Sequence, residues 1–373
     1  MIVGVLKETA EHERRVALTP EVATQIVKQE LEVWVEANAG SSSNFPNGEY
    51  ETAGAQIAAN RDEIISKSNI LLTIHPPSEA ELTKLKKNSI LICLLWARQH
   101  PKLVDTLKKL GISALGMDFI PRISRAQNMD VLSSMSSIAG YKSALIAANE
   151  LDKYLPMMMT AAGTIPPSKS LVLGAGVAGL QAIATLKRLG SVVEAFDIRP
   201  EVKEQVESLG AKFVEVPLEE AVTQTEGGYA KELDKSSQDR QREVIHEHAK
   251  KSDIVITTAL IPGRPAPLLI TKEMVADMSP GSVIVDIASE NGGNCELTEH
   301  GKTVEKHGVK IVGPNNLPSQ LSLHASKLYS KNMYALLNLL IKDGKPNFDF
   351  EDEILLNTTV THQGEIISPM LKE

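Results

Sequence analysis

The chain has 373 residues, of which 42% are hydrophobic and 23% are charged, and its formal net charge is −8 at pH 7. This length corresponds to about two domains, and the composition is that of a globular protein with a sizeable core rather than of a disordered chain. The negative charge disfavours a nucleic acid or an anionic membrane as partner. The only two cysteines, Cys93 and Cys295, exclude a disulfide scaffold and suit a reducing compartment.

No segment has the pattern of a membrane span or an export signal. The longest apolar run, Ile90 to Trp96, is far shorter than the roughly 18 residues that a membrane span needs. The first residues lack the basic and then apolar pattern of a signal peptide. We therefore expect a cytoplasmic protein with no direct membrane insertion.

Short runs rich in Val, Ile and Leu alternate with helical stretches along most of the chain. They lack a clean polar alternation, which is typical of strands buried on both faces of a parallel sheet. The predicted strands are Ile2–Leu6, Glu32–Glu36, Ile70–Ile74, Ile90–Leu95, Ala114–Phe119, Leu171–Leu173, Val192–Phe196, Lys212–Val216, Ile254–Thr257, Val283–Ile287 and Lys310–Val312. This order predicts an α/β protein with two Rossmann-like, doubly wound parallel-sheet domains and a cleft between them.

Several helix boundaries follow from capping signals. Thr19-Pro20-Glu21 places a hydroxyl at the N-cap, proline at the first helical position and an acid in the first turn, so a helix is predicted from there to about Gln29. The Ala-rich segment Ser137–Tyr154 is predicted to be a long helix that joins the two domains. Ser326–Leu340 is again helical in pattern and lies beyond the last strand, so it is expected to return to the first domain.

These elements divide the chain into a first α/β domain, residues 1–135 with 320–373, and a second domain, residues 136–319. One segment of the second domain, Pro217 to Lys251, is dense in Glu, Gln, Lys and Asp and carries two adjacent glycines. It is too long for an ordinary connection between a strand and a helix. It is either a solvated helix pair or a mobile lid, over about residues 217–240, whose glycines act as a hinge.

The most specific motif is the glycine-rich turn Gly174-Ala-Gly176-Val-Ala-Gly179. It follows a predicted strand and opens a predicted helix, as in dinucleotide-binding folds. Gly174 permits the tight turn, Gly176 lets the backbone approach a pyrophosphate, and Gly179 lets the helix pack close to the strand. The N-terminus of this helix offers free N–H groups and a partial positive charge to phosphates.

An acidic residue stands where such a fold needs one. Asp197 ends the next predicted strand, and its carboxylate can accept both ribose hydroxyls of NAD and repel the 2′-phosphate of NADP. Arg199 weakens this selectivity argument, because a guanidinium can meet a phosphate. The alternative is a glycine-rich turn that binds no ligand.

A dinucleotide site alone does not name a reaction. None of the nine histidines lies in a motif that marks a general base, and no Cys/His spacing indicates zinc, so no metal site is predicted. A second polar cluster, Pro121 to Ser134, combines cations, an amide, an acid and hydroxyls just before the long predicted helix. It either lines a cleft between the domains or satisfies its own turn hydrogen bonds.

Several long and unusual strings are familiar from one family: RVALTPEV, PRISRAQNMDVLSS, PMMMTAAGTIPP, GAGVAGLQAIATLKRLG, KEQVESLGAKF, GGYAKE, TTALIPGRPAP and ASENGGNC. Over nearly its full length the chain resembles the NAD(H)-binding component, the α1-type subunit, of proton-translocating NAD(P) transhydrogenases. The wider superfamily includes alanine dehydrogenase, which shares RVALTP and the glycine motif.

The resemblance implies a set of site residues. Arg122, Asp130 and Ser133 would contact the nicotinamide and its ribose, and Gln127 would reach toward NADP(H) on a partner subunit. Arg122, Gln127 and Asp130 are thus the catalytic candidates. The implied cofactor-binding residues are Arg122, Gln127, Asp130, Val131, Leu132, Ser133, Gly174, Gly176, Val177, Gly179, Asp197, Ile198, Arg199, Gly228, Tyr229, Ala259 and Leu260. Of these, Gly228 and Tyr229 would belong to a mobile loop that closes over the cofactor.

The resemblance also accounts for the missing general base. Hydride would pass directly between NADH on this chain and NADP⁺ on a partner, so no substrate hydroxyl or amine has to lose a proton. The family implies a homodimer that docks on membrane-spanning and NADP(H)-binding subunits, with proton translocation in the membrane partner. It therefore implies a cytoplasmic protein held peripherally at the inner membrane.

Two other functions compete with this one. An alanine dehydrogenase-like oxidoreductase would use the arginine of RVALTP, Arg15, but its catalytic histidine is absent near Leu95-Trp96. A non-catalytic NAD-binding module would not need the polar loop that contains Gln127. One departure from the transhydrogenase pattern is Gln320, where the family usually has arginine.

Overall fold

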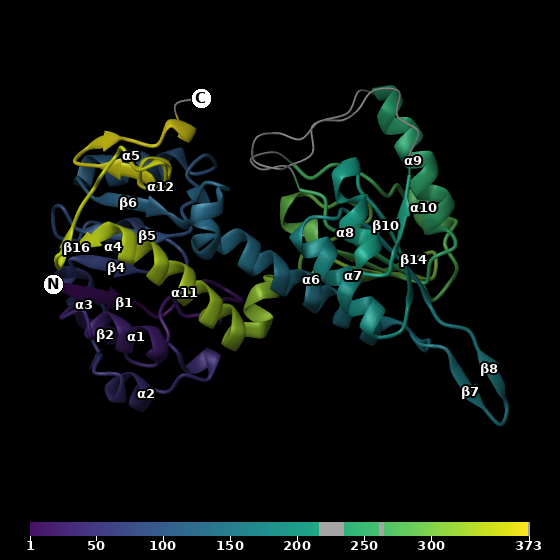
Figure 1. The fold of residues 1–373 in the computed structure, drawn as a ribbon, viewed down its shortest axis with the longest axis horizontal. Helices are drawn as coiled ribbons and strands as arrows, with labels where there is room; N and C mark the ends of the chain where they lie inside the picture. Colours follow the sequence, from purple (N-terminus) through teal and green to yellow (C-terminus); the bar gives the residue numbers. More distant parts are fainter. Residues whose placement is uncertain (216–234, 261–264, 372–373) are drawn as a thin grey trace. The chain divides into compact units, whose positions relative to one another are not determined.

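The computed structural model describes residues 1–215, 235–260 and 265–371. These form two compact units: unit 1 is Met1–Met135 with Ser319–Glu373, and unit 2 is Ser136–Pro318. The first division falls within the helix α6 (Val131–Glu150). Each unit is organised around one large sheet (Figure 1).

Unit 1 contains an eight-stranded sheet in the order β19-β18-β6-β5-β4-β1-β2-β3. Its strands are β1 (Ile2–Val5), β2 (Glu32–Glu36), β3 (Gln56–Ala58), β4 (Ile70–Leu72), β5 (Ile90–Cys93), β6 (Ser113–Gly116), β18 (Thr359–His362) and β19 (Glu365–Ile366). The first six are parallel and follow the Rossmann order 3-2-1-4-5-6, whereas β18 and β19 extend the sheet in antiparallel fashion.

The helices of unit 1 pack on this sheet through buried apolar side chains. They are α1 (Pro20–Val27), α2 (Asn47–Thr52), α3 (Arg61–Lys67), α4 (Glu79–Leu82), α5 (Pro101–Leu110), α11 (Ser322–Leu340) and α12 (Glu353–Thr358). As predicted, α11 returns to this unit, where its side chains bind the segment after β1. Ser326 Oγ accepts from the N–H of Val16, and Ser330 Oγ accepts from the N–H of Thr19, each at 3.0 Å.

Unit 2 contains a seven-stranded sheet in the order β11-β10-β9-β12-β13-β15-β14. Its strands are β9 (Lys169–Leu173), β10 (Val192–Phe196), β11 (Lys212–Val214), β12 (Ile254–Thr257), β13 (Val283–Asp286), β14 (Thr303–Lys306) and β15 (Val309–Val312). All neighbours are parallel except β14 and β15. Without β14 the order is again 3-2-1-4-5-6, so both units have the predicted Rossmann-like, doubly wound architecture.

Both faces of the second sheet are buried. Alternate residues of β9 join different apolar clusters: Val172 packs with residues of α6 and of α7 (Val177–Arg188), while Leu171 and Leu173 pack with residues of α9 (Lys235–Ala249) and α10 (Lys272–Ala276). A short helix, α8 (Lys203–Ser208), precedes β11. Burial on both faces explains why these strands appear in the sequence as continuous apolar runs.

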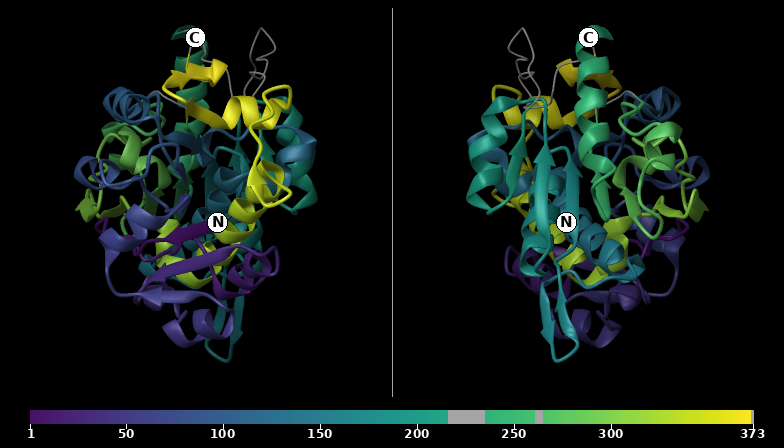
Figure 2. Two further views of the ribbon diagram at one scale, coloured as in Figure 1. Left: turned by 90° about the vertical axis from the view of Figure 1, so that its left-hand side faces the viewer. Right: turned by 90° about the vertical axis from the view of Figure 1, so that its right-hand side faces the viewer.

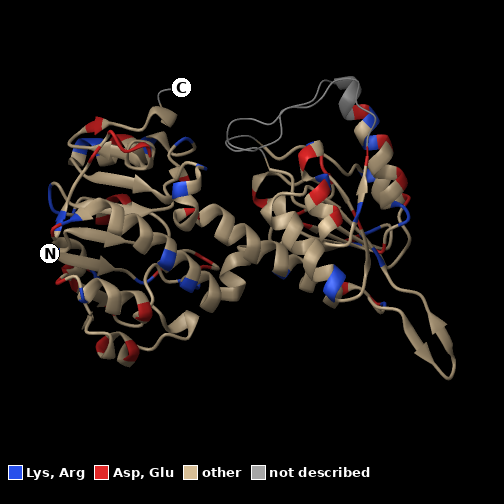
Figure 3. Cartoon of the chain, viewed as in Figure 1, with Lys and Arg blue, Asp and Glu red and all other residues tan. Residues whose placement is uncertain are grey.

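A hairpin of unit 2 extends away from the sheet (Figure 2). It consists of β7 (Met158–Thr160) and β8 (Gly163–Ile165), which pair with each other only. The sequence analysis expected this region to be an interruption without strands. The hairpin carries no charged residue (Figure 3), and its Met159 side chain is 79% exposed.

Other boundaries differ from prediction for local reasons. Helix α6 begins at Val131 rather than near Ser137, because the Asp130 carboxylate accepts hydrogen bonds from the N–H and hydroxyl of Ser133 and so caps the helix early. Thr19 is the N-cap of α1, as predicted. Its hydroxyl, however, lies 3.3 Å from Ser330 Oγ instead of bonding the first turn.

Both cysteines are buried and unpaired with each other. Burial raises the pKa of Cys93 well above its usual value and that of Cys295 to about 11. Both thiols are therefore poor nucleophiles at neutral pH. Among the described residues, no helix combines the length and the apolar character that crossing a bilayer requires.

Candidate functional site

The glycine-rich turn lies at the topological switch point of the second sheet. It connects β9 to α7, and β9 is flanked by β10 on one side and β12 on the other. In doubly wound sheets, ligands bind at the carboxyl ends of the strands at such a point. The segment after β12, which contains Ala259 and Leu260, borders the same point, because the N–H of Thr258 bonds the carbonyl of Leu173 at 2.8 Å.

The three glycines of the turn meet different surroundings. Gly174 has φ +99°, and a Cβ on Gly179 would lie 1.8 Å from the carbonyl oxygen of Gly174, so both are required by the fold itself. A Cβ on Gly176 would meet nothing within 4 Å, and the φ of Gly176 is −76°. The fold therefore does not explain the glycine at 176, whereas a ligand over the turn would.

Gly176 is also the N-cap of α7 and offers no capping side chain. The first N–H groups of a helix have no acceptor within it, and together they attract an anion. Val177 begins this helix with a side chain that is 43% exposed, and Leu260 beyond β12 is 40% exposed. Exposed backbone donors beside exposed apolar side chains fit a ligand with both phosphates and planar rings, as NAD has.

Asp197 follows β10 and points back at the turn. Its carboxylate accepts from the N–H of Ala175 at 2.7 Å and from the N–H of Arg199 at 2.9 Å. The guanidinium of Arg199 adds two bonds, at 2.8 and 2.9 Å. The hydrogen bond to Asp197 raises the pKa of Arg199 above its usual value.

Ala259 is held from behind by Asn294, which the sequence analysis did not single out. The amide oxygen of Asn294 accepts from the N–H of Ala259 at 3.0 Å, and the amide nitrogen donates to the carbonyls of Ala259 and Pro267. The N–H of Asn294 in turn donates to buried Asp286 at 2.8 Å. A buried aspartate just after an apolar strand was the signal that could have drawn attention to this loop.

A second unrecognised residue is Gly140 of α6. A Cβ at this position would lie 2.0 Å from the carbonyl oxygen of Ala178, so glycine lets α6 contact the first turn of α7. The helix whose N-terminus faces the candidate site is thus braced by a neighbouring helix.

The polar loop of the sequence analysis lies in unit 1 and is largely helical. Gln127 is exposed and lies in a short 3-10 helix, η3 (Ser124–Met129), and exposed Arg122 precedes it. Asp130, Val131, Leu132 and Ser133 form the N-cap and first turn of α6. The amide of Asn332 in α11 donates to the carbonyl of Asn128 at 2.8 Å and supports this segment.

The structure therefore groups the predicted residues into two sets, one in each unit. Arg122 to Ser133 belong to unit 1; Gly174 to Arg199, with Ala259 and Leu260, belong to unit 2. Gly228 and Tyr229 lie outside the described residues. The predicted lid over 217–240 does so up to residue 234, and residues 235–240 belong to α9.

Unit 1 has no glycine-rich turn at its own switch point, between β1 and β4. Instead, Glu8 after β1 accepts from the N–H of Ile74 at 2.6 Å. Next to it, the guanidinium of Arg15 donates to Glu13 at 2.6 and 2.8 Å, and Glu13 lies 2.9 Å from His75 Nε2. Burial opposes ionisation of Glu13, but the bonds from Arg15 and His75 outweigh it and hold its pKa well below its usual range.

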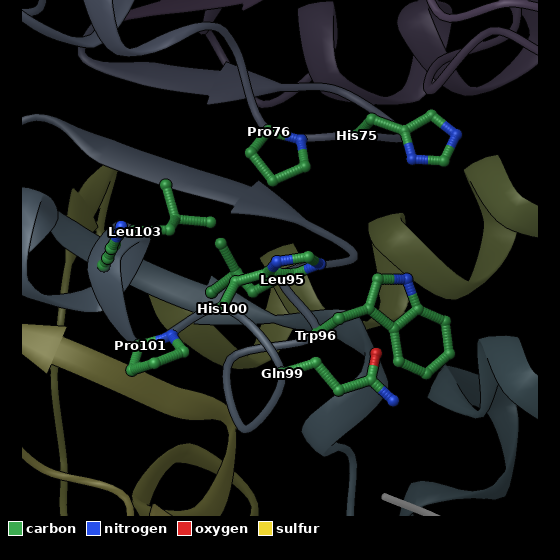
Figure 4. A pocket seen from close by; sticks show the side chains of 9 residues that line it. His75, Pro76, Leu95, Trp96, Gln99, His100, Pro101 and Leu103 are labelled. Atoms are coloured by element: carbon green, nitrogen blue, oxygen red, sulfur yellow. The ribbon is translucent and has the colours of Figure 1, made fainter. Parts of the chain in front are cut away.

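Beside this cluster is a cavity of about 540 Å³ (Figure 4). It is lined by the segments that follow β4 and β5, including His75, Trp96 and His100. Trp96 has φ +46°, and its N–H donates to Asp118 at 2.9 Å. Position 96 therefore places an indole in this cavity, close to where an alanine dehydrogenase would be expected to have its catalytic histidine.

Within the described part of the chain, no group of three or more His, Cys, Asp or Glu side chains could hold a metal ion. Two Rossmann-order sheets, with a glycine-rich turn and a carboxylate at one switch point, define a two-domain, dinucleotide-binding α/β protein. The chain belongs to the alanine dehydrogenase/PNT family. It matches the N-terminal domain of that family over residues 4–139 and the C-terminal domain over residues 143–369.

Known relatives place it more closely. The chain is 47% identical over 379 residues to the first of the separate chains that make up NAD(P) transhydrogenase subunit alpha in Rhodospirillum rubrum, covering 100% of this chain and 99% of that protein. It is 46% identical over 372 residues to NAD(P) transhydrogenase subunit alpha of Haemophilus influenzae, covering 99% of this chain and 72% of that one. The predicted membership is confirmed: the chain is a transhydrogenase subunit, and hence belongs to an oxidoreductase.

Solved structures agree with this placement. A transhydrogenase structure from Sinorhizobium meliloti has a TM-score of 0.89 and 42% identity, covering 98% of this chain and 100% of that chain. An L-alanine dehydrogenase structure has a TM-score of 0.82 and 26% identity, covering 100% of this chain and 98% of that chain. Use of nicotinamide nucleotides follows from the family; which nucleotide this chain binds is a separate question.

Proposed function

We propose that this chain is the NAD(H)-binding subunit of a proton-translocating transhydrogenase. NADH bound here gives hydride directly to NADP⁺ bound on a partner subunit. The observation that carries this proposal is Gly176, whose Cβ position is open and whose glycine is explained by a ligand rather than by the fold.

Residues of unit 2 support binding of the adenosine half. Gly176 and the N-terminal N–H groups of α7 suit the pyrophosphate, and Asp197 suits the ribose hydroxyls. Val177, Ile198, Ala259 and Leu260 offer adjoining surface. When bound, the cofactor supplies the nicotinamide that donates the hydride; the chain supplies binding and orientation.

Residues of unit 1 suit the reacting half. Asp130 and Ser133 form a fixed, hydrogen-bonded pair at the start of α6 and can hold a ribose or carboxamide group. Arg122 and Gln127 are exposed on the preceding segment. We assign Gln127 the contact with the partner's NADP(H), because η3 presents it to the outside and α11 holds that segment in place.

The remaining elements of the proposal concern assembly. The subunit is a homodimer that docks on membrane-spanning and NADP(H)-binding subunits, and through them it lies peripherally at the cytoplasmic face of the inner membrane. Hydride transfer here is coupled to proton translocation in the membrane partner. Gly228 and Tyr229 are assigned to a loop that closes over the cofactor.

Two measurements test the proposal. Titration calorimetry is expected to give much tighter binding of NADH than of NADPH, and equal affinities would contradict the role of Asp197. Mixed with a heterologous NADP(H)-binding subunit, the chain is expected to transfer hydride from NADH to an NADP⁺ analogue. Alanine-dependent reduction of NAD⁺ would instead support the alanine dehydrogenase alternative.

The Gln127→Asn variant tests the reacting face. It is expected to bind NADH as the wild type does but to slow single-turnover hydride transfer about tenfold, because a small loss of alignment is costly in rate. Gln56→Asn, at an exposed glutamine on β3 of the same unit, is the control and should change neither quantity. Unchanged single-turnover rates in Gln127→Asn would remove this residue from the mechanism.

A further inference from the structure

The carboxylate of Asp197 is saturated by donors of the chain itself. An ionised carboxylate has about four lone-pair positions. Four N–H donors occupy them here: two backbone groups, of Ala175 and Arg199, and two groups of the Arg199 guanidinium. The two side chains are almost fully buried against each other, at 6% exposure for Asp197 and 13% for Arg199.

These four donors divide into two kinds. The backbone N–H groups belong to the glycine turn and to the end of β10, so they hold the carboxylate in place whatever the side chain of Arg199 does. The guanidinium is carried by a flexible side chain and can leave. If it leaves, two acceptor positions become open, one on each carboxylate oxygen.

Two acceptor positions are what the 2′- and 3′-hydroxyls of a ribose require. We propose that Arg199 is an internal competitor of the ribose: its guanidinium occupies Asp197 in the free protein and has to move aside for the adenosine half of the nucleotide to bind. This inference rests on the proposed function, since it deepens the role of Asp197 there. It makes Arg199 a residue that limits affinity and favours exchange of spent cofactor.

The chemistry of the pair gives the expected size of the effect. A bidentate bond between arginine and a carboxylate is among the stronger hydrogen-bonded pairs in proteins, and breaking it opposes binding of the ribose. Some of this cost returns when the guanidinium regains water. Removing the guanidinium is therefore expected to strengthen the contribution of the ribose hydroxyls by about three- to thirtyfold.

Loss of a positive charge near the site also weakens attraction for the phosphates, and the test has to separate these two effects. AMP and its 2′,3′-dideoxy analogue carry the same phosphate and differ only in the two hydroxyls. The ratio of their dissociation constants cancels the effect of charge. Displacement of NADH, followed by its fluorescence, measures both constants.

In Arg199→Ala, AMP is expected to gain at least threefold over dideoxy-AMP relative to the wild type. Arg199→Lys, which keeps the charge but cannot bond both oxygens in the same way, should give an intermediate ratio. Arg188→Ala removes a cation from the exposed end of α7 and should leave the ratio unchanged. Thermal unfolding checks that each variant is folded.

The outcomes separate the two proposals. A ratio in both folded Arg199 variants that equals or falls below that of the wild type overturns the competitor role while leaving NADH binding intact. Absence of NADH binding in the wild type would instead overturn the proposed function itself.

Discussion

Glu8 is a carboxyl group placed where it resists ionisation. It lies at the switch point of unit 1, and burial raises its pKa from 4.5 to about 7, although the N–H of Ile74 bonds it. The folded state therefore holds a proton that the unfolded chain releases above pH 4.5. The stability that this group contributes is fully present below that pH and is lost as the pH rises to about 7.

The Glu8→Gln variant removes this dependence and keeps an acceptor for the N–H of Ile74. Relative to the wild type, it is expected to gain about 2 to 3 kcal/mol in the free energy of unfolding between pH 5 and pH 8. Urea unfolding at both pH values measures the gain. Glu51→Gln, at an exposed glutamate of α2, is the control. A pH-independent difference between Glu8→Gln and wild type would show that Glu8 ionises normally.

At the scale of single elements, the turn between β9 and α7 separates what the fold needs from what a ligand needs. Gly179→Ala is expected to destabilise the protein by more than about 2 kcal/mol, the cost of severe overpacking, because its Cβ would collide with the carbonyl of Gly174. Gly176→Ala has room for the methyl group and should cost about 1 kcal/mol or less.

The same pair predicts opposite effects on binding. Gly176→Ala is expected to weaken NADH binding at least tenfold, since the methyl group occupies the space that the pyrophosphate needs. Thermal unfolding and titration calorimetry on both variants measure the two effects. If Gly176→Ala is folded and binds NADH with wild-type affinity, the pyrophosphate does not lie over this turn.

The elements that the sequence predicts best are those buried on two faces. β2, β10 and β12 have the predicted boundaries, because runs of Val and Ile between polar residues leave little choice. Edge strands were missed: β3 is only three residues long, and β14 contains Thr, Glu and Lys, so neither resembles a core strand. The hairpin of β7 and β8 was missed because its pairing partner is local and its turn, Ala161-Ala162, has no turn signal.

The candidate site was predictable to a similar extent. Gly174, Gly179 and Asp197 are constrained by the backbone and so form a readable motif. The resemblance supplied Arg122 to Ser133. The support from Asn294 and Gly140 could not be inferred, because each acts on a residue distant in sequence, Ala259 and Ala178 respectively. The guanidinium of Arg199 on Asp197 likewise required side-chain geometry.

At the scale of the whole molecule, the exposed hairpin bears on the proposed dimer. Two strands that pair only with each other are marginally stable in water, and exposed apolar side chains without charges commonly mark an interface. We expect the hairpin to contact a second copy of the chain. Met159→Asp should convert dimer to monomer in light scattering, with at most a small change in thermal unfolding of each unit.

The control is Met157→Leu, which keeps the apolar surface at the base of the same hairpin. A Met159→Asp protein that stays dimeric would place the contact elsewhere on the chain. A wild-type chain that is monomeric at micromolar concentration would remove the homodimer from the proposal altogether.

The burial of both thiols has a practical consequence. Neither Cys93 nor Cys295 should react appreciably with maleimide dyes while the protein is folded, so the native chain provides an almost blank background for labelling. One cysteine introduced at Ala161, at the tip of the hairpin, would then carry a fluorophore alone. Energy transfer between such labels on two copies would follow assembly in real time, without deleting any natural residue.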